Sequence, residues 1–368
     1  MATSAIGPGF LTQTAVFSKT LLASFGFAIL ISVLIDWIIQ WQIWHTIIVS
    51  GKPAQTVVEE VVPWGGKLLS VIIIVGGWVF NAGNLAGCGL GISVITGWEP
   101  WIGSALSAGV VWLIFIYPGF TKNMDRITVL LGSCVLLILM YTLFKTQPPI
   151  QLAIEKTFLP DQVEPMIILT LVGGTVGGYI SFSGAHRLLQ DDISGEHHWL
   201  KARKTALSGL FITAFVRYGF FLAVLGIVAG GYVWNEEQPA LNFFSAIEGK
   251  WASLFFGVVI WVAAITSVIG CTYTSVSFAD GWVKNFAAHR HKYMWAFLVA
   301  SFLLLMIAGR PVSWLIFAGT INGMLLPITL IILLIAGQRL SVRLSKIFRL
   351  LVLLVALLLL ALTVYTLL

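Results

Sequence analysis

The sequence of 368 residues is 58% hydrophobic and only 10% charged, with a formal net charge of +6. One soluble core of this size does not use so many apolar residues, so a soluble globular protein is excluded and a multi-pass membrane protein is predicted. The positive net charge reflects basic loops beside the membrane and does not indicate nucleic-acid binding.

Eleven apolar segments are long enough to cross a bilayer, which takes about 18 or more residues with few charges. In chain order they lie near residues 5–22, 25–44, 66–96, 99–118, 125–145, 165–189, 205–231, 251–279, 292–309, 312–336 and 348–368. The last is a plain lipid-facing sequence, which suggests an added helix. We expect a single all-α domain without linkers, and a short surface helix in the loop 146–164.

Lys and Arg are unevenly divided between the two sides of this topology. Of the 21, 15 lie on one side, five on the other, and Arg217 lies inside a segment. Basic residues concentrate in cytoplasmic loops, so we expect a cytoplasmic N-terminus, an external C-terminus and residence in the plasma (inner) membrane. No secretory signal is expected, because residues 1–10 contain no Lys or Arg. Cys88, Cys134 and Cys271 fall in apolar segments, so no disulfide is expected.

The sixth segment contains four glycines, Gly173, Gly174, Gly177 and Gly178, where a spanning helix is normally regular. Each costs about 1 kcal/mol of helix propensity, and loosened backbone cannot remain unpaired in hydrocarbon. One explanation is close packing of small residues, as in the GxxxG spacing of Gly173 and Gly177. The other is a broken helix whose free peptide groups form a binding site.

A second interruption lies in the first segment, where Gly-Pro-Gly at 7–9 precedes Thr12, Gln13 and Thr14. Interrupted segments at corresponding places in two halves indicate an inverted repeat with its binding site at the breaks. We therefore expect one repeat over about 1–146, a second over about 165–336 and the extra helix over about 348–368. Free N–H groups at such breaks bind anions or polar groups, and free carbonyls bind cations.

Two charged residues lie deep inside predicted spans. Asp36 is about twelve residues into the second segment, and Arg217 is about as far into the seventh. An ionised group there costs several kcal/mol unless it is paired or hydrated, which makes it a functional candidate. We expect the two to face the interior, either as a gating pair or as a proton-coupling group and an anion-binding group respectively. The alternative is that each lies near an interface and extends to water.

Other polar residues are less specific. Asn81 and Asn84 share one face of the third segment, and Thr266 is one of several hydroxyl residues in the eighth, most of which bond to helix backbone. His186 and Asp191 fit the HxxxxD pattern of membrane acyltransferases, where the Asp orients a general base. Because two fixed positions arise often by chance, the favoured interpretation of His186 and its neighbour Arg187 is an inner gate or interfacial pair.

The stretches GPGFL, NAGNLAGCGLGISVITG, VGGTVGGYISFSGAHRLL and IWVAAITSVIGCTYTSVSF occur in this order. Together they resemble the NRAMP family of divalent-metal transporters over nearly the whole chain. The resemblance implies a LeuT-type fold, with ten helices in a five-plus-five inverted repeat plus an eleventh. It also implies alternating access driven by protons.

The chain departs from this family at the metal-binding motifs. The family's DPGN motif corresponds to the region of residues 12–14, its MPH motif to residues 177–179, and its acidic pair to Asn81 and Asn84. Every matched position is neutral here. Transition metals prefer imidazole, thioether or carboxylate ligands, so amides, hydroxyls and carbonyls alone would bind a divalent ion weakly.

The sequence therefore predicts an NRAMP-related secondary transporter, not an enzyme, that takes up a small polar or anionic organic solute with protons. A divalent cation such as Mn²⁺ or Mg²⁺ is the alternative cargo, for which Asp36 would replace the missing carboxylate. A passive channel is a third alternative. No cofactor is expected beyond a proton or cation as co-substrate, and the expected partners are the solute or ion and the lipid bilayer. The candidate substrate-binding residues are Thr12, Gln13, Thr14, Asn81, Asn84, Gly174, Gly177, Gly178, Tyr179 and Thr266, and the candidate coupling or gating residues are Asp36, Arg217, His186 and Arg187.

Overall fold

The computed structural model describes residues 7–116, 133, 136–137, 139–231, 239, 250–280, 282–283, 286–309, 311–340 and 344–368. Most of these residues are helical, and none of them forms a strand. The longer helices are α2 (Pro8–Leu21), α3 (Phe25–Ser50), α5 (Gly65–Thr96), α6 (Pro100–Ile116), α9 (Pro165–Thr175), α10 (Tyr179–Gln190), α11 (Trp199–Ala229), α12 (Lys250–Ser277), α13 (Phe286–Ala308), α14 (Pro311–Arg339) and α15 (Lys346–Leu367). The shorter ones are η1 (Leu22–Ser24), α4 (Ala54–Glu59), α8 (Ile150–Phe158) and η2 (Glu196–His198).

The predicted spans coincide with these helices, apart from the fifth, which lies mostly outside the described residues. Eight helical stretches among the described residues are long and apolar enough to cross a membrane, and α6 is a shorter apolar helix. The predicted surface helix is α8. The all-α prediction is confirmed, and Cys88 and Cys271 are free and buried as expected, while Cys134 lies outside the described residues.

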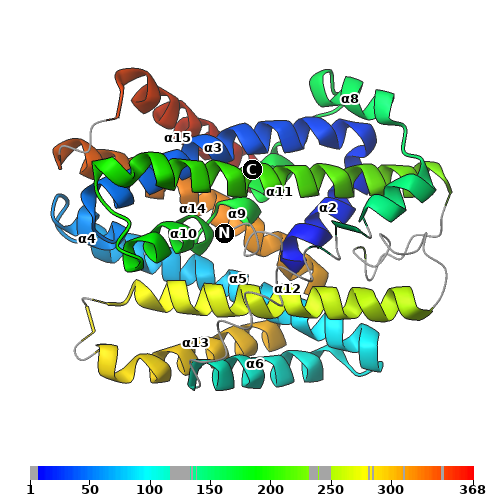
Figure 1. Cartoon of the computed structure of the whole chain (residues 1–368), viewed down its shortest axis with the longest axis horizontal. Helices are drawn as coiled ribbons and strands as arrows, with labels where there is room; N and C mark the ends of the chain where they lie inside the picture. The colour runs from blue at the N-terminus through cyan, green and yellow to red at the C-terminus, as the bar shows by residue number, and fades with distance from the viewer. Residues whose placement is uncertain are drawn as a thin grey trace.

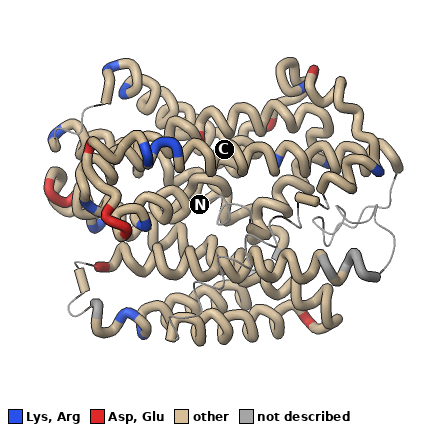
Figure 2. The backbone as a smooth tube through the Cα atoms, viewed as in Figure 1, with Lys and Arg blue, Asp and Glu red and all other residues tan. Residues whose placement is uncertain are grey.

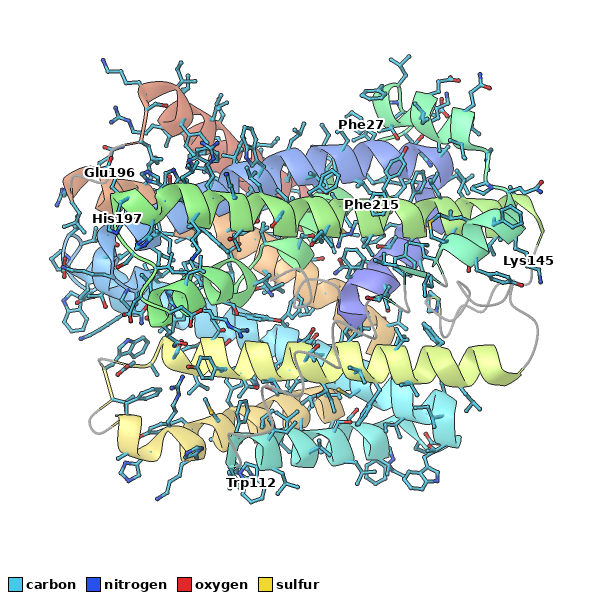
Figure 3. All side chains as sticks on the ribbon, in the orientation of Figure 1. Phe27, Trp112, Lys145, Glu196, His197 and Phe215 are labelled. Carbon is cyan, nitrogen blue, oxygen red and sulfur yellow. The ribbon has the colours of Figure 1, made fainter. Side chains whose placement is uncertain are left out.

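The helices are arranged around a short central pair. In Figure 1, α9 and α10 lie between α3 and α11 on one side and α5 and α12 on the other, while α6 and α13 form one outer edge. Charged residues gather towards the helix ends and leave the middle almost uncharged (Figure 2). Figure 3 shows Glu196 and His197 at one end of the molecule and Lys145 at the other. Which end faces the cytoplasm stays a prediction, as does the division into two repeats.

The sixth predicted span is broken in its middle. Helix α9 ends at Thr175 and α10 begins at Tyr179, after 11 and 12 residues respectively. At 1.5 Å per residue each helix is about 16–18 Å long, so neither crosses a hydrocarbon core of about 30 Å alone. The break places helix ends and loosened backbone deep inside the protein, where every residue from Ile167 to Phe182 is buried.

The first predicted span is described only from Gly7 onward, because residues 1–6 lie outside the described part of the chain. Helix α2 is continuous from Pro8 to Leu21, so Thr12, Gln13 and Thr14 lie in regular helix. The Gly-Pro-Gly sequence lies where this helix starts, with Gly7 at its N-cap and Pro8 at its first turn, a position that proline favours, and an interruption at this point stays a prediction. With 14 residues, α2 is about 21 Å long and is also too short to cross the hydrocarbon core.

Candidate functional site

The break between α9 and α10 requires glycine. Gly178 has φ +55° and ψ −131°, a conformation that residues with a side chain rarely adopt. The Oδ1 atom of Asn322, from α14, lies where a Cβ of Gly178 would be, and a Cβ at Gly177 would meet the Gly173 carbonyl oxygen. Any larger residue at the break would therefore both strain the backbone and displace these neighbours.

The close-packing explanation is correct for the neighbouring glycine. Gly173 lies against the backbone of Gly319 and Gly323 in α14, where a Cβ would overlap the Gly319 carbonyl oxygen. The two glycine positions of the GxxxG pattern thus have different roles, because Gly173 brings α9 onto α14 while Gly177 belongs to the break. The contact between α9 and α14 also places Asn322 beside the break. Asn322 Nδ2 donates to the carbonyl oxygens of Gly76 and Ala318 at 3.2 and 2.9 Å.

The first turn of α2 lies beside the same region. A Cβ at Gly7 would be 2.9 Å from Ser267 Oγ and 3.7 Å from Asn84 Oδ1. Asn84 is in turn a neighbour of the buried Tyr179 hydroxyl, at the first residue of α10. The N-termini of α2 and α10 therefore approach Asn84 from two sides. Each N-terminus carries unpaired N–H groups and a partial positive charge.

Arg217, from α11, extends its guanidinium to the C-terminus of α9 and the first turn of α2. Nη1 donates to Thr175 Oγ1 at 2.7 Å, at the last residue of α9. The guanidinium carbon lies 4.2 Å from the ring centre of Phe10, in the first turn of α2. Arg217 is only 2% exposed, and its Nε and Nη2 atoms have no hydrogen-bond partner. The interfacial alternative for Arg217 is therefore wrong, because the side chain is buried among helices.

Asp36, from α3, is completely buried, and neither carboxyl oxygen has a hydrogen-bond partner. Arg217 is the charged group that acts on it, although no ion pair between the two is present among the described residues. The interfacial alternative is wrong for Asp36 as well. The structure thus places Asp36 and Arg217 close enough to interact electrostatically, although they form no ion pair.

Several unpaired polar atoms surround the break. Gln13 donates from Nε2 to Leu315 O at 3.1 Å, while its Oε1 has no partner and lies 2.6 Å from the place of a Cβ on Gly174. Atoms without a partner also occur on Asn84 (Nδ2), Tyr179 (the hydroxyl), Ser267 (Oγ) and Asn322 (Oδ1). Buried polar groups are normally satisfied, so such a concentration indicates a place for solvent or a ligand.

Sequence reasoning missed Asn322 and Ser267. Asn322 is an amide within the otherwise apolar segment 312–336, and the cost of such a group in a membrane was the available signal. Ser267 directly follows Thr266, so the choice between adjacent hydroxyls depended on the helix rotation. Thr266 Oγ1 donates to Ala263 O within its own helix, whereas Ser267 faces Gly7.

The remaining predicted residues lie in other surroundings. Asn81 donates to Thr272 Oγ1 and Ser301 Oγ at 3.3 and 3.2 Å, which ties α5 to α12 and α13. Thr14 bonds to Phe10 O within α2, and Thr12 is buried in the same helix. None of the hydrogen bonds described for Asn81 and Thr14 reaches the break between α9 and α10. A substrate-binding role for these side chains stays a prediction.

His186 lies towards the C-terminal end of α10, where it contacts α4 and the residue that directly follows α12. Its Nε2 accepts a hydrogen bond from the Ala54 backbone N–H at 3.3 Å, and its ring stacks on Phe278 at 5.2 Å. No described hydrogen bond joins it to Asp191, as the acyltransferase pattern would require. Arg187 is exposed beside it. This location is compatible with the predicted inner gate.

The chemistry of the site is that of amides, hydroxyls, free peptide groups and one guanidinium. Among the described residues, no group of three or more His, Cys, Asp or Glu side chains is placed to hold a metal ion. Cys271 is the one soft donor near Tyr179, and its Sγ donates to Gly77 O at 3.1 Å. The arrangement offers unpaired hydrogen-bond donors and acceptors together with one buried cation.

The chain matches the family model described as "Natural resistance-associated macrophage protein-like" (Nramp) over residues 2–368. It is 46% identical over 339 residues to an uncharacterized membrane protein of Haemophilus influenzae, covering 92% of this chain and 85% of the relative. It is 42% identical to the uncharacterized membrane protein YcsG of Bacillus subtilis, covering 92% and 84% of the two chains.

Two kinds of solved structure share the fold. A manganese transporter of Eremococcus coleocola has a TM-score of 0.72 at 14% identity, covering 99% of this chain and 84% of that one. The nucleobase-cation-symport-1 family transporter Mhp1 has a TM-score of 0.58 at 12% identity, covering 99% and 90%. The broken helix at the centre, the family match and these likenesses agree. The chain is a member of the Nramp family, a multi-pass membrane transporter with the LeuT-like fold.

Proposed function

We propose that this protein is a secondary active transporter that takes up a small anionic organic solute by alternating access, coupled to protons. One observation carries the proposal, which is the buried guanidinium of Arg217 at the break, with two nitrogen atoms unpaired. A buried cation with two unpaired donor nitrogens and, among the described residues, no ion-paired carboxylate is costly. An anionic cargo would supply the missing acceptors each time it binds.

Two of the helix ends at the break favour the same charge, whereas the C-terminus of α9, beside Arg217, carries a partial negative charge. The N-termini of α2 and α10 each add a partial positive charge of roughly half a unit and free N–H groups. Thr175 orients the guanidinium through Nη1, which leaves Nε and Nη2 for the cargo. A carboxylate matches the two parallel donors of a guanidinium better than any neutral group does.

The neutral groups would hold the rest of the solute. Gln13 Oε1 and Asn322 Oδ1 are unpaired acceptors, and Asn84 Nδ2 is an unpaired donor. Tyr179 offers a hydroxyl, and its ring packs against Phe80 with the centres 5.6 Å apart. This set favours a small carboxylate that also carries hydrogen-bonding groups over a purely apolar acid.

Asp36 is our candidate for proton coupling. It is the buried carboxyl group that lies in the electrostatic neighbourhood of Arg217. A carboxyl group that accepts a proton from one side and releases it to the other changes the field at Arg217, and thereby the affinity for an anion. His186 and Arg187 would act in opening the end of α10 to the cytoplasm, which we place at the side richer in Lys and Arg.

A divalent cation is the second candidate cargo. The fold likeness to a manganese transporter and the membership of the Nramp family favour it. Asp36, Cys271 and the amide oxygens of Gln13 and Asn322 are the donors this chain offers. Against it stands the buried guanidinium of Arg217, because a cation placed beside it would be repelled.

Uptake into proteoliposomes tests both cargoes and the coupling. The purified protein would be given an inward proton gradient and radiolabelled lactate, succinate or glutamate, or radiolabelled manganese. We expect saturable uptake of a carboxylate that collapses when the gradient is abolished. Uptake of manganese alone would refute the organic cargo, and uptake that ignores the gradient and does not saturate would indicate a channel.

A variant pair separates coupling from binding. Asp36→Asn is expected to abolish gradient-driven uptake and to preserve exchange of labelled for unlabelled solute, because exchange needs no net proton movement. Asp192→Asn is the control, since Asp192 is exposed and has φ +58°, a conformation that asparagine tolerates. Full gradient-driven uptake by the Asp36→Asn protein would contradict the coupling role.

A further inference from the structure

A second polar feature lies outside the transport path, where α3, α11 and α15 meet at Trp41. The Trp41 ring centre is 5.4 Å from that of Trp199 at the start of α11 and 5.4 Å from that of Phe348 at the start of α15. Trp37 stands one helical turn away, at 6.0 Å. Tryptophan is typical of the boundary between hydrocarbon and headgroups. This corner therefore lies at one membrane interface.

A hollow opens between α3 and α11 at this corner. Its walls are almost entirely apolar, and it is partly open to the surroundings of the protein. The residues that line it are Trp37, Gln40, Trp41, Trp199, Arg203, Ala206, Leu207 and Leu210. The lining thus combines a hydrocarbon-compatible surface with one cation, Arg203.

Arg203 is an unneutralised cation. Its guanidinium carbon lies 5.1 Å from the Trp41 ring centre, and its buried Nε has no hydrogen-bond partner. Among the described residues no carboxylate forms an ion pair with it. Glu196, on the adjoining η2, acts electrostatically on His45. Stacking on Trp41 fixes the guanidinium in place and leaves its remaining donors for an external acceptor.

Further cations lie near the starts of α11 and α15, the two helix starts that meet at Trp41. Lys201 and Lys204 are exposed on the first turns of α11, and Lys346 and Arg349 are on the first turns of α15 beside Phe348. Figure 2 shows both helix starts as basic. None of these four forms an ion pair among the described residues. The hollow is therefore an apolar surface with basic residues near it.

We propose that this corner binds an acidic phospholipid of the adjacent leaflet. The phosphate would accept hydrogen bonds from Arg203, the flanking lysines would attract the negative headgroup, and an acyl chain would lie along Trp37, Leu207 and Leu210. Basic pockets between spanning helices have the chemistry that recognises anionic headgroups. A zwitterionic lipid brings its own cation into this field and is bound less tightly.

A lipid bound at this corner would affect transport through the contact between α3 and α11. It would bridge α3, which carries Asp36, and α11, which carries Arg217, at a shared end of the two helices. Gln40 already joins them there, with Nε2 donating to Ala206 O at 3.4 Å. A bound lipid would stabilise this pair. The proposal concerns a lipid site and holds whichever cargo the protein carries.

Native mass spectrometry and thermal unfolding of the detergent-purified protein test the site. Phosphatidylglycerol and phosphatidylcholine with identical acyl chains would be added in turn, and inorganic phosphate would be added alone. We expect retention and stabilisation by phosphatidylglycerol only. Equal effects of the two lipids, or an equal effect of inorganic phosphate, would overturn the proposal.

Arg203→Gln and Arg290→Gln form a matched pair of variants. Arg290 also stacks on an aromatic ring, that of Tyr273 at 4.2 Å, and also has a buried unpaired Nε, but it does not line the hollow. Arg203→Gln is expected to bind phosphatidylglycerol about fivefold more weakly, the effect typical of one basic residue near a membrane surface. Equal binding by the two variants would refute the site.

A second variant tests the site should Arg203→Gln not fold. The double variant Lys201→Gln/Lys204→Gln, in which both side chains are exposed, is expected to weaken binding by the same amount or more. Unchanged binding by this double variant would also refute the site.

Discussion

The most informative single residue is Arg217. Its depth in an apolar segment made it a functional candidate but left an interfacial position open, because a long side chain near a helix end can extend to water; its burial decides for the interior. Its partners were not predictable, since Thr175 and Phe10 are distant in the sequence and depend on how α2, α9 and α11 pack. Ser267 and Asn322 were not predicted for the same reason. Ser267 faces the site because of the rotation of α12, and Asn322 reaches the break because α9 packs against α14.

Substitution of Arg217 tests the anion site by affinity. Arg217→Gln removes charge-assisted hydrogen bonds worth about 1.5–3 kcal/mol each, so the dissociation constant for a transported carboxylate should rise about 10- to 100-fold. The ligand-free protein should unfold at an unchanged or higher temperature, because a buried charge with unpaired donors is removed. Isothermal titration and thermal unfolding measure the two quantities.

The control for Arg217 is Lys292→Gln, at an exposed position of α13. It should alter neither the affinity nor the unfolding temperature. An Arg217→Gln protein that binds the carboxylate as tightly as this control would remove the guanidinium from the site. A protein that no longer folds would show instead that Arg217 is neutralised within the structure.

At the scale of the elements, the two glycine-rich spans had different outcomes. The sixth was correctly predicted to be broken, because two adjacent glycines in hydrocarbon indicate backbone that other parts of the protein must satisfy. The first was interpreted as interrupted at Gly7-Pro8-Gly9, where α2 begins, and because residues 1–6 lie outside the described residues this interruption stays a prediction. Glycine and proline at a helix N-terminus look the same in sequence as glycine and proline at a break.

A pair of glycine substitutions tests the break. Gly178 and Gly97 both have positive φ, +55° and +75°, so an alanine at either carries a backbone cost of about 1–2 kcal/mol. A Cβ at Gly178 would also collide with Asn322, whereas nothing lies within 4 Å at Gly97. Gly178→Ala should therefore abolish uptake and lower the unfolding temperature further than Gly97→Ala, which should retain uptake. Equal uptake by both variants would contradict a functional break.

For the whole molecule, hydropathy alone predicted the order of the spans and the all-α class, because a bilayer leaves few ways to satisfy a backbone. The family resemblance supplied the LeuT-like fold, which the structural likenesses confirm. The cargo depends on the chemistry of the centre rather than on the fold. Our proposal of an anionic cargo therefore rests on the neutral residues at the positions that match the metal motifs and on the buried guanidinium of Arg217 beside the break.

A thermal-shift comparison of the purified protein tests this central claim most directly, because a ligand that prefers the folded state raises the apparent stability. Small carboxylates, matched neutral amides and Mn²⁺ would be compared at equal concentration. The anion site predicts a rise of the unfolding temperature with at least one carboxylate, a smaller effect of its amide and none with Mn²⁺. A large rise with Mn²⁺ and none with any carboxylate would contradict it.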